Sequence, residues 1–121
     1  MKQLTKAEEE VMQILWTLGE GVIKDILNGF TNKQPAYNTV ATVLKVLKNK
    51  EVVDYKKIGN VYVYFPLISK EEYSSFQMKH LLKNYFEGSF ARLAAFFAKD
   101  NDMSIEDLEE LLKEAENKKS K

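Results

Sequence analysis

The segment from Ala36 to Lys50 constrains the fold more than any other part of the chain, because the periodicity of apolar residues changes at its end. Within the segment, apolar residues recur every three or four positions, as on the buried face of a helix: Val40, Val43, Leu44 and Leu47. From Val53 onward apolar and polar residues alternate, and Gly59-Asn60 divides this region into two strands. The sequence therefore predicts a helix followed by a β-hairpin.

The opposite face of the predicted helix carries short polar groups and cations, as a helix entering the major groove of DNA needs. We predict base contacts from Asn38, Thr39 and Thr42. Phosphate contacts are predicted for a second set, on the helix and the hairpin: Tyr37, Lys45, Lys48, Lys56, Lys57 and Asn60. The alternatives are that the lysines form an ordinary solvated surface and that Asn38 and Thr39 serve only the start of the helix.

The formal net charge of zero conceals an uneven distribution of charge. Up to Lys70, ten lysines stand against seven acidic residues, and the remainder of the chain has the opposite imbalance. Between Lys33 and Lys57, six lysines are accompanied only by the acidic residues Glu51 and Asp54. The positive charge is thus concentrated around the predicted helix and hairpin, which favours a polyanionic partner.

Capping motifs predict further helices on both sides of this region. Each has a hydroxyl residue three positions before a carboxylate, and they are Thr5-Lys-Ala-Glu8, Ser69-Lys-Glu-Glu72 and Ser104-Ile-Glu-Asp107. A short helix is expected over 22–28, and Trp16 is expected to fill the core, because it continues the apolar side of the first helix. The predicted fold class is mainly α with a small β-hairpin: a winged helix-turn-helix followed by a C-terminal helical dimerisation region.

We predict a winged-helix DNA-binding domain over 1–68 and a helical dimerisation region over 69–121. The second region is rich in apolar residues at helical spacing, with a break near Gly88. Short helices are marginal in water unless an apolar face is buried, and twofold dimers are the commonest oligomers. We therefore expect a homodimer that buries Tyr73, Phe76, Leu81, Leu82, Tyr85, Phe86, Phe90, Leu93, Phe97, Leu108, Leu111 and Leu112.

Few residues could support catalysis or metal binding. The chain has no cysteine and one histidine, His80, so we expect no thiolate or multi-histidine metal site and no catalytic triad. Its acidic pairs lie at helix starts or on polar faces, where they keep the surface hydrated. We expect neither a cofactor nor enzymatic activity. No membrane-spanning or secretory segment is evident, and we expect a cytoplasmic protein.

Three groups of residues together resemble the penicillinase-repressor (BlaI/MecI/CopY) family of bacterial winged-helix regulators. One looks like its opening motif: Leu4-Thr5, Ala7-Glu8, Val11-Met12 and Leu15-Trp16. Another looks like its recognition helix: Tyr37, Thr39-Val40, Thr42-Val43-Leu44 and Leu47. The last looks like its wing and the exit from it: Tyr62, Tyr64 and Pro66-Leu67. The similarity covers nearly the whole chain.

The resemblance implies a transcriptional repressor that binds an inverted-repeat operator as a homodimer and controls a β-lactam-resistance-like or related stress operon. It also implies a partner, a membrane sensor metalloprotease that cuts such repressors in an Asn-Phe pair aligned with Phe96-Phe97. Phenylalanine replaces that asparagine here, so release without this cut is an alternative. The Cys-x-Cys pairs of the copper-responsive branch are absent. Ala41 and Val46 stand where many relatives have arginine or another polar residue, which implies weaker or differently specified operator binding.

Two other classes of function stay open on sequence grounds. A winged helix also serves as a protein-interaction module without DNA binding, because a fold does not dictate its function. An enzyme or small-molecule-binding domain is disfavoured, because the titratable residues of such sites are missing. Binding of duplex DNA distinguishes the repressor from both.

Overall fold

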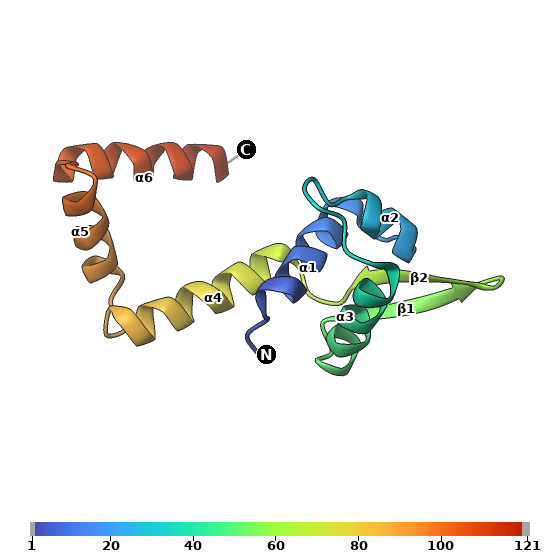
Figure 1. Ribbon diagram of the computed structural model, residues 1–121. Helices are drawn as coiled ribbons and strands as arrows, with labels where there is room; N and C mark the ends of the chain where they lie inside the picture. Colours follow the sequence, from blue (N-terminus) through green and yellow to red (C-terminus); the bar gives the residue numbers. More distant parts are fainter. Residues whose placement is uncertain (1, 120–121) are drawn as a thin grey trace. The chain divides into compact units, whose positions relative to one another are not determined.

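The computed structural model describes residues 2–119, with side chains as far as residue 116. Over this part of the chain the elements follow in the order α1 (Lys6–Leu18), α2 (Ile23–Asn28), α3 (Tyr37–Asn49), β1 (Val53–Ile58), β2 (Val61–Pro66), α4 (Lys70–Tyr85), α5 (Phe90–Asp100) and α6 (Ile105–Lys119) (Figure 1). This confirms the predicted fold class, mainly helical with one β-hairpin.

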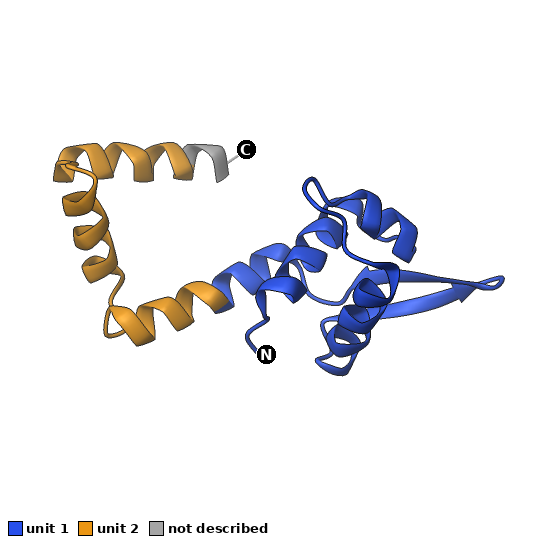
Figure 2. Ribbon diagram, in the orientation of Figure 1, with its two compact units in different colours: residues 1–76 blue, residues 77–121 orange. Residues whose placement is uncertain are grey.

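The chain divides into two compact units, unit 1 as far as Phe76 and unit 2 from Gln77 onward (Figure 2). Helix α4 is continuous across this division, so its first two turns belong to unit 1. The predicted functional boundary after residue 68 stays a prediction.

Helix α1 begins at the predicted capping box. The Thr5 hydroxyl accepts a hydrogen bond from the backbone N–H of Glu8 at 3.2 Å, and the Glu8 carboxylate accepts one from the N–H of Thr5 at 2.9 Å. The helix ends at Gly19, whose φ of 82° favours glycine. Helix α2 follows after the four residues 19–22, and its short length matches the prediction over 22–28.

The hairpin has the register that the alternating pattern requires. Strands β1 and β2 pair antiparallel from Val53 with Pro66 to Ile58 with Val61, and Gly59 in the turn has a φ of 63°. Gly21 forms a bridge to Tyr64, with N···O distances of 2.9 and 2.8 Å, and so joins the loop after α1 to β2. Because successive side chains of a strand point to opposite faces, Tyr55 and Lys57 share the face of the buried Val53.

The core of unit 1 lies between its three helices and the base of the hairpin. Its fully buried side chains include Met12 and Leu15 from α1, Ile26 from α2, and Leu44 and Leu47 from α3. The predicted apolar stripe of α3 is thus buried, although Val43 is only partly so. Trp16 packs against this core but is also only partly buried, and its indole N–H reaches the backbone of Ile68.

Unit 2 contains the end of α4 together with α5 and α6. Gly88, with a φ of 77°, lies at the predicted break, and Ser89 caps α5 by accepting from the N–H of Arg92. Ser104 and Asp107 form the predicted reciprocal cap at the start of α6. Among the side chains described for 77–116, Ala98 alone is buried. Each of the described helices is too short or too polar to span a lipid bilayer.

Candidate nucleic-acid interface

The outer face of α3 is exposed to solvent. Its exposed side chains include all the predicted base-contacting residues and two lysines: Asn38, Thr39, Thr42, Lys45, Val46, Lys48 and Asn49. The face exists because the stripe of Val40, Leu44 and Leu47 fixes the rotation of the helix about its axis. Ala41 packs partly against the core, so it does not share this outer face.

The three predicted base-contacting residues lie at different positions of α3. Asn38 and Thr39 lie in its first turn. The N-cap residue is Ala36, so neither of them occupies the capping position. The Thr42 hydroxyl donates a hydrogen bond to the backbone oxygen of Asn38 at 2.9 Å. Its proton is therefore engaged within the helix, while its methyl group and oxygen lone pairs remain on the exposed face.

Three of the predicted phosphate-contacting lysines lie on two different faces at the hairpin. Lys48 lies 3.6 Å from the carboxylate of Asp54 and 5.3 Å from the ring centroid of Tyr55, which links α3 to the hairpin. Lys57 lies over the ring of Tyr62 at 5.9 Å. Lys56 points to the opposite face of the hairpin and forms an ion pair with Glu20 at 3.0 Å. Lys57, but not Lys56, thus lies on the hairpin face that also carries Tyr55.

Three tyrosines cluster on the hairpin, and Tyr37 at the start of α3 acts electrostatically on one of them, Tyr64. The rings of Tyr55 and Tyr62 meet edge to face at 4.6 Å, and Tyr55 and Tyr64 are 5.6 Å apart. Burial raises the pKa of the Tyr64 phenol above its ordinary value of 10.0, and the neighbouring phenols Tyr55, Tyr37 and Tyr62 raise it further. The Tyr64 hydroxyl is therefore protonated at neutral pH.

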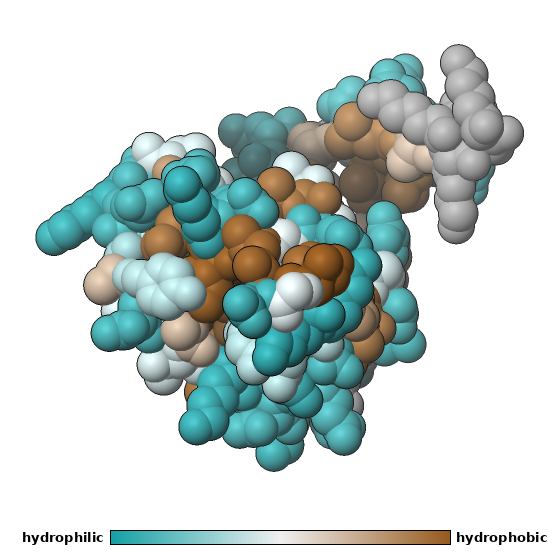
Figure 3. Space-filling model, turned by 90° about the vertical axis from the view of Figure 1, so that its right-hand side faces the viewer, coloured by the Kyte–Doolittle hydropathy of each residue, from teal (hydrophilic) through white to brown (hydrophobic). Residues whose placement is uncertain are grey.

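The tip of the hairpin is more apolar than the sequence-based assignment of Lys56, Lys57 and Asn60 suggests. Ile58 and Val61, which flank the turn, are 58% and 48% exposed. A view from the side toward which the hairpin points shows apolar surface bordered by hydrophilic side chains (Figure 3). The sequence contains this signal, because Ile58 and Val61 are the apolar residues on either side of Gly59-Asn60.

Lys50, which belongs to the basic cluster in the sequence, has a structural role. Its ammonium group lies 2.6 Å from the carboxylate of Glu8, whose residue is only 6% exposed. Burial alone would raise the pKa of this carboxyl group, but hydrogen bonds from Lys50 and Thr5 and the charge of Lys50 outweigh it and lower the pKa. The pair ties the start of α1 to the end of α3, a long-range contact that sequence spacing did not reveal.

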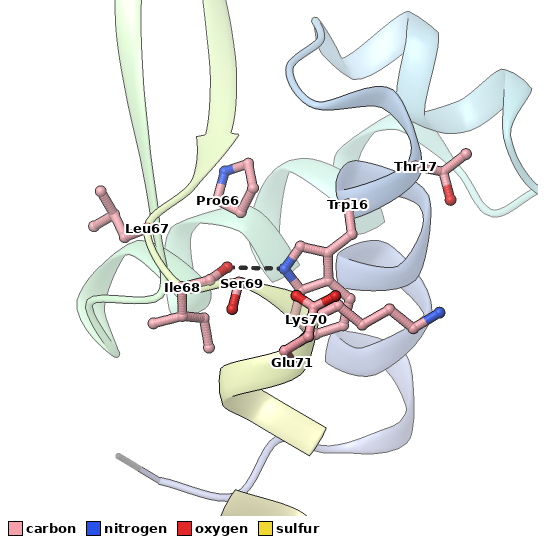
Figure 4. A pocket seen from close by; sticks show the side chains of 8 residues that line it. All are labelled: Trp16, Thr17, Pro66, Leu67, Ile68, Ser69, Lys70 and Glu71. Carbon is pink, nitrogen blue, oxygen red and sulfur yellow. Dashed lines mark hydrogen bonds between the residues drawn. The ribbon is translucent and has the colours of Figure 1, made fainter. Parts of the chain in front are cut away.

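A surface pocket of ≈ 520 Å³ lies where the chain passes from β2 to α4 (Figure 4). Trp16 forms one wall, and its indole N–H donates to the backbone oxygen of Ile68 at 2.9 Å. Lys70 and Glu71 border the opening. The hydrogen bond fixes the segment between the hairpin and α4, which gives Trp16 a structural role.

The predicted dimerisation residues occupy different environments. Tyr73 is 5% exposed within unit 1, where its hydroxyl accepts from the N–H of Leu4 and donates to Glu9, both at 3.0 Å. Phe76 packs partly against the same core. Within unit 2, Leu82, Phe86, Leu93 and Leu108 are partly buried, whereas Leu81, Tyr85, Phe90, Phe97, Leu111 and Leu112 are exposed. Met78, Phe96 and Ile105 are exposed as well, although the prediction did not assign them to the interface.

Taken together, the three-helix core, the outward face of α3 and the hairpin define a winged helix-turn-helix protein. The chain belongs to the penicillinase repressor family, whose model matches residues 4–117. This is a family of transcriptional repressors and not of enzymes, which confirms the predicted class of protein.

Among individual relatives, the chain is 26% identical over 110 residues to the methicillin resistance regulatory protein MecI of Staphylococcus aureus (strain N315), covering 90% of this chain and 89% of that protein. It is 26% identical over 121 residues to the penicillinase repressor of Bacillus licheniformis, covering 97% and 94% respectively. The "CopR Repressor Structure" is 32% identical, with a TM-score of 0.47, and the match covers 56% of this chain and 100% of that chain.

Proposed function

We propose that the protein represses transcription as a homodimer that binds an inverted-repeat DNA operator, with one α3 in each half-site. The observation that carries this proposal is the outer face of α3, which is exposed, mostly polar and includes Lys45 and Lys48, while Lys57 lies over Tyr62 on the neighbouring hairpin. Such a surface has the chemistry of a duplex-binding helix, in which short polar groups meet base edges and lysines meet phosphates.

The proposed contacts follow from the exposed groups. Asn38, Thr39 and Thr42 contact bases, whereas Tyr37, Lys45, Lys48, Lys57 and Asn60 contact phosphates. Lys56 reaches a phosphate only by giving up Glu20, so its contribution is smaller. The exposed ion pair is weak enough for such an exchange.

Exposed apolar surface in unit 2 supports the homodimer. Within the described residues, Tyr85, Phe90 and Phe96 are 74%, 56% and 59% exposed, and unit 2 has almost no buried core of its own. Helices of this length are not stable in water with their apolar faces uncovered. A second copy of the chain covers such a surface and also supplies the second α3 that an inverted repeat requires.

The names of the relatives support the type of operon. Proteins called methicillin resistance regulatory protein and penicillinase repressor are matched over nearly their full length. We therefore assign this repressor to a β-lactam-resistance-like or related stress operon, in the cytoplasm, where a bacterial regulator meets its DNA.

A membrane sensor metalloprotease is the proposed partner that relieves repression. The Phe96-Phe97 pair, proposed as its cleavage site, has exposed side chains, but its peptide bond lies inside α5. Local unwinding of α5 must therefore precede any cut at this bond.

A mobility-shift titration with the promoter DNA upstream of the protein's own gene, run at two salt concentrations, tests the proposal. We expect the protein to bind this duplex more tightly than random DNA. Replacing Lys45 by Ala should weaken binding to both duplexes and reduce the salt slope by about 1, because one phosphate contact is lost. The control is Lys79→Ala, an exposed lysine on α4 in unit 2, which should leave the slope unchanged.

The rival function, a protein-interaction module, predicts no preference for any duplex and no salt-dependent binding. A protein that fails to shift both the promoter and random DNA would refute the repressor proposal.

A further inference from the structure

Two side chains give the outer face of α3 an apolar strip among its polar groups. Val46 is 37% exposed, and Thr42 lies one turn before it on the same face. The Thr42 hydroxyl already donates to the backbone oxygen of Asn38 at 2.9 Å. What these two residues jointly present to the outside is therefore mainly methyl groups, in the middle of the face proposed to contact bases.

The position of this strip on the outer face follows from the rotation of α3 about its axis. Residues 40, 44 and 47, which define the opposite face of α3, are at most 1% exposed, so the rotation of the helix is fixed. Val46 cannot turn inward without exposing that core. An isopropyl group at this position forms no hydrogen bond with a base edge or a phosphate.

The major groove offers one apolar group on the edges of the bases, the C5-methyl of thymine. The surrounding surface fits a duplex as the occupant, because Lys45 and Lys48 lie on either side of Val46 in the sequence of the same helix and are both exposed. A methyl group placed against the strip loses its contact with water, which favours thymine over every base that lacks it.

We infer that Thr42 and Val46 form a methyl-reading pair that selects thymine by its C5-methyl, and that Val46 is a specificity-determining residue of this chain. The inference rests on the proposed function, because it assumes that α3 enters the major groove of an operator. It goes further by naming the chemical group recognised and the two residues that recognise it.

The test begins with selection of duplexes from a random-sequence pool by the full-length protein. Each thymine of the selected duplex is then replaced by deoxyuridine, which removes only the C5-methyl and keeps base pairing. For the unaltered protein we expect one or two positions per half-site at which the affinity falls about three- to fivefold, the effect of one buried methyl group. All other replacements should have no effect.

Three variants test whether Thr42 and Val46 cause the loss of affinity for deoxyuridine. Val46→Ala and Thr42→Ser remove methyl groups, so each should abolish the penalty for deoxyuridine at one of those positions. Thr42→Val keeps the γ-methyl group and replaces the hydroxyl by a second methyl, and it should retain the penalty in full. Because the two positions are exposed, thermal melting of each variant should match that of the unaltered protein, which confirms that folding is intact.

The outcomes separate the inference from the proposed function. If the pool yields no enriched duplex, DNA recognition by α3 fails and the proposed function fails with it. If a duplex is enriched but tolerates deoxyuridine at every position, the protein binds DNA without reading methyl groups, and the inference is overturned alone. Retention of the penalty in both Val46→Ala and Thr42→Ser would also overturn it.

Discussion

Adjacent lysines at the hairpin differ in the partners that the structure gives them. Lys57 lies over Tyr62 on the face that continues toward α3, whereas Lys56 pairs with Glu20 on the other face. We expect Lys57→Ala to weaken binding to promoter and random DNA alike and to lower the salt slope by about 1. Lys56→Ala should change the slope by much less, because its ammonium group is neutralised within the chain. Salt-dependent mobility shifts measure both.

The two variants control for each other, since each removes one lysine from the same strand. Equal reductions of the salt slope by the two variants would mean that both faces of the hairpin contact DNA phosphates. The alternation that separates the two lysines could be derived from the sequence. The partner of Lys56 could not, because Glu20 approaches only through the bridge between Gly21 and Tyr64.

The buried carboxylate of Glu8 should make stability depend on acid. Its pKa in the folded chain lies below the ordinary value of 4.5, so its pairing with Lys50 stabilises the fold above that pH and the contribution is lost as pH falls through the folded pKa. Glu8→Gln keeps the oxygen that caps Thr5 but removes the charge. We expect the variant to lose about 1.5–3 kcal/mol of unfolding free energy at neutral pH, typical of a hydrogen bond to a charged group.

Urea denaturation at pH 7 and at several lower pH values measures this difference, which should shrink below pH 4.5. Glu10→Gln is the matched control, because Glu10 is exposed on the same helix. A difference between Glu8→Gln and the unaltered protein that stays constant down to the lowest pH would show that the charge of Glu8 does not act through Lys50.

Among the elements, those with local signals were predictable. Capping pairs such as Thr5 with Glu8 and Ser69 with Glu72 locate helix starts, because both partners lie within one turn. Contacts between distant residues had no such signal. The bond from Trp16 to Ile68 and that from Leu4 to Tyr73 depend on the way α4 returns to α1, which periodicity alone does not specify.

The first two turns of α4 are anchored to α1 by the hydroxyl of Tyr73. The ring also packs near Trp16 and Phe76, each at 6.0 Å between centroids. Tyr73→Phe preserves this packing but leaves the buried N–H of Leu4 without its partner. We expect a loss of about 1–3 kcal/mol of unfolding free energy, the cost of an unsatisfied buried group.

The matched control is Tyr85→Phe, since Tyr85 is 74% exposed on the same helix. Its unfolding free energy should stay within about 0.5 kcal/mol of the unaltered protein, as for most surface substitutions. Denaturant melts of the two variants provide the measurement. Equal stability of Tyr73→Phe and Tyr85→Phe would mean that the N–H of Leu4 finds another acceptor.

At the scale of the whole molecule, the sequence predicts burial in unit 1 more fully than in unit 2. In unit 1 the apolar stripes of α1 and α3 are buried by the same chain, as expected. In unit 2 similar stripes remain exposed over the described residues. A periodic pattern shows that a face must be buried but not which chain buries it. For this reason the sequence alone could not tell that Tyr73 is buried by its own chain whereas Phe97 is left exposed.

The proposed homodimer predicts that one charge in the apolar surface of unit 2 should separate the subunits. Phe97 is 48% exposed in α5, and Phe97→Glu removes apolar area while it places a carboxylate in the interface. Lys99→Glu is the matched control, because it places the same residue two positions along, in the last turn of α5 where Lys99 lies exposed. Sedimentation at micromolar concentration should give a monomer for Phe97→Glu and a dimer for Lys99→Glu.

DNA binding should also differ between the two variants, Phe97→Glu and Lys99→Glu. A dimer binds two half-sites with the second contact made at high effective concentration, so it prefers a duplex with both half-sites by about 100-fold or more over one with a single half-site. Phe97→Glu should lose this preference while it retains the affinity for a single half-site, since α3 is unaltered. If Phe97→Glu stays dimeric and keeps the preference, the subunits join through another surface and the assignment of unit 2 to dimerisation is wrong.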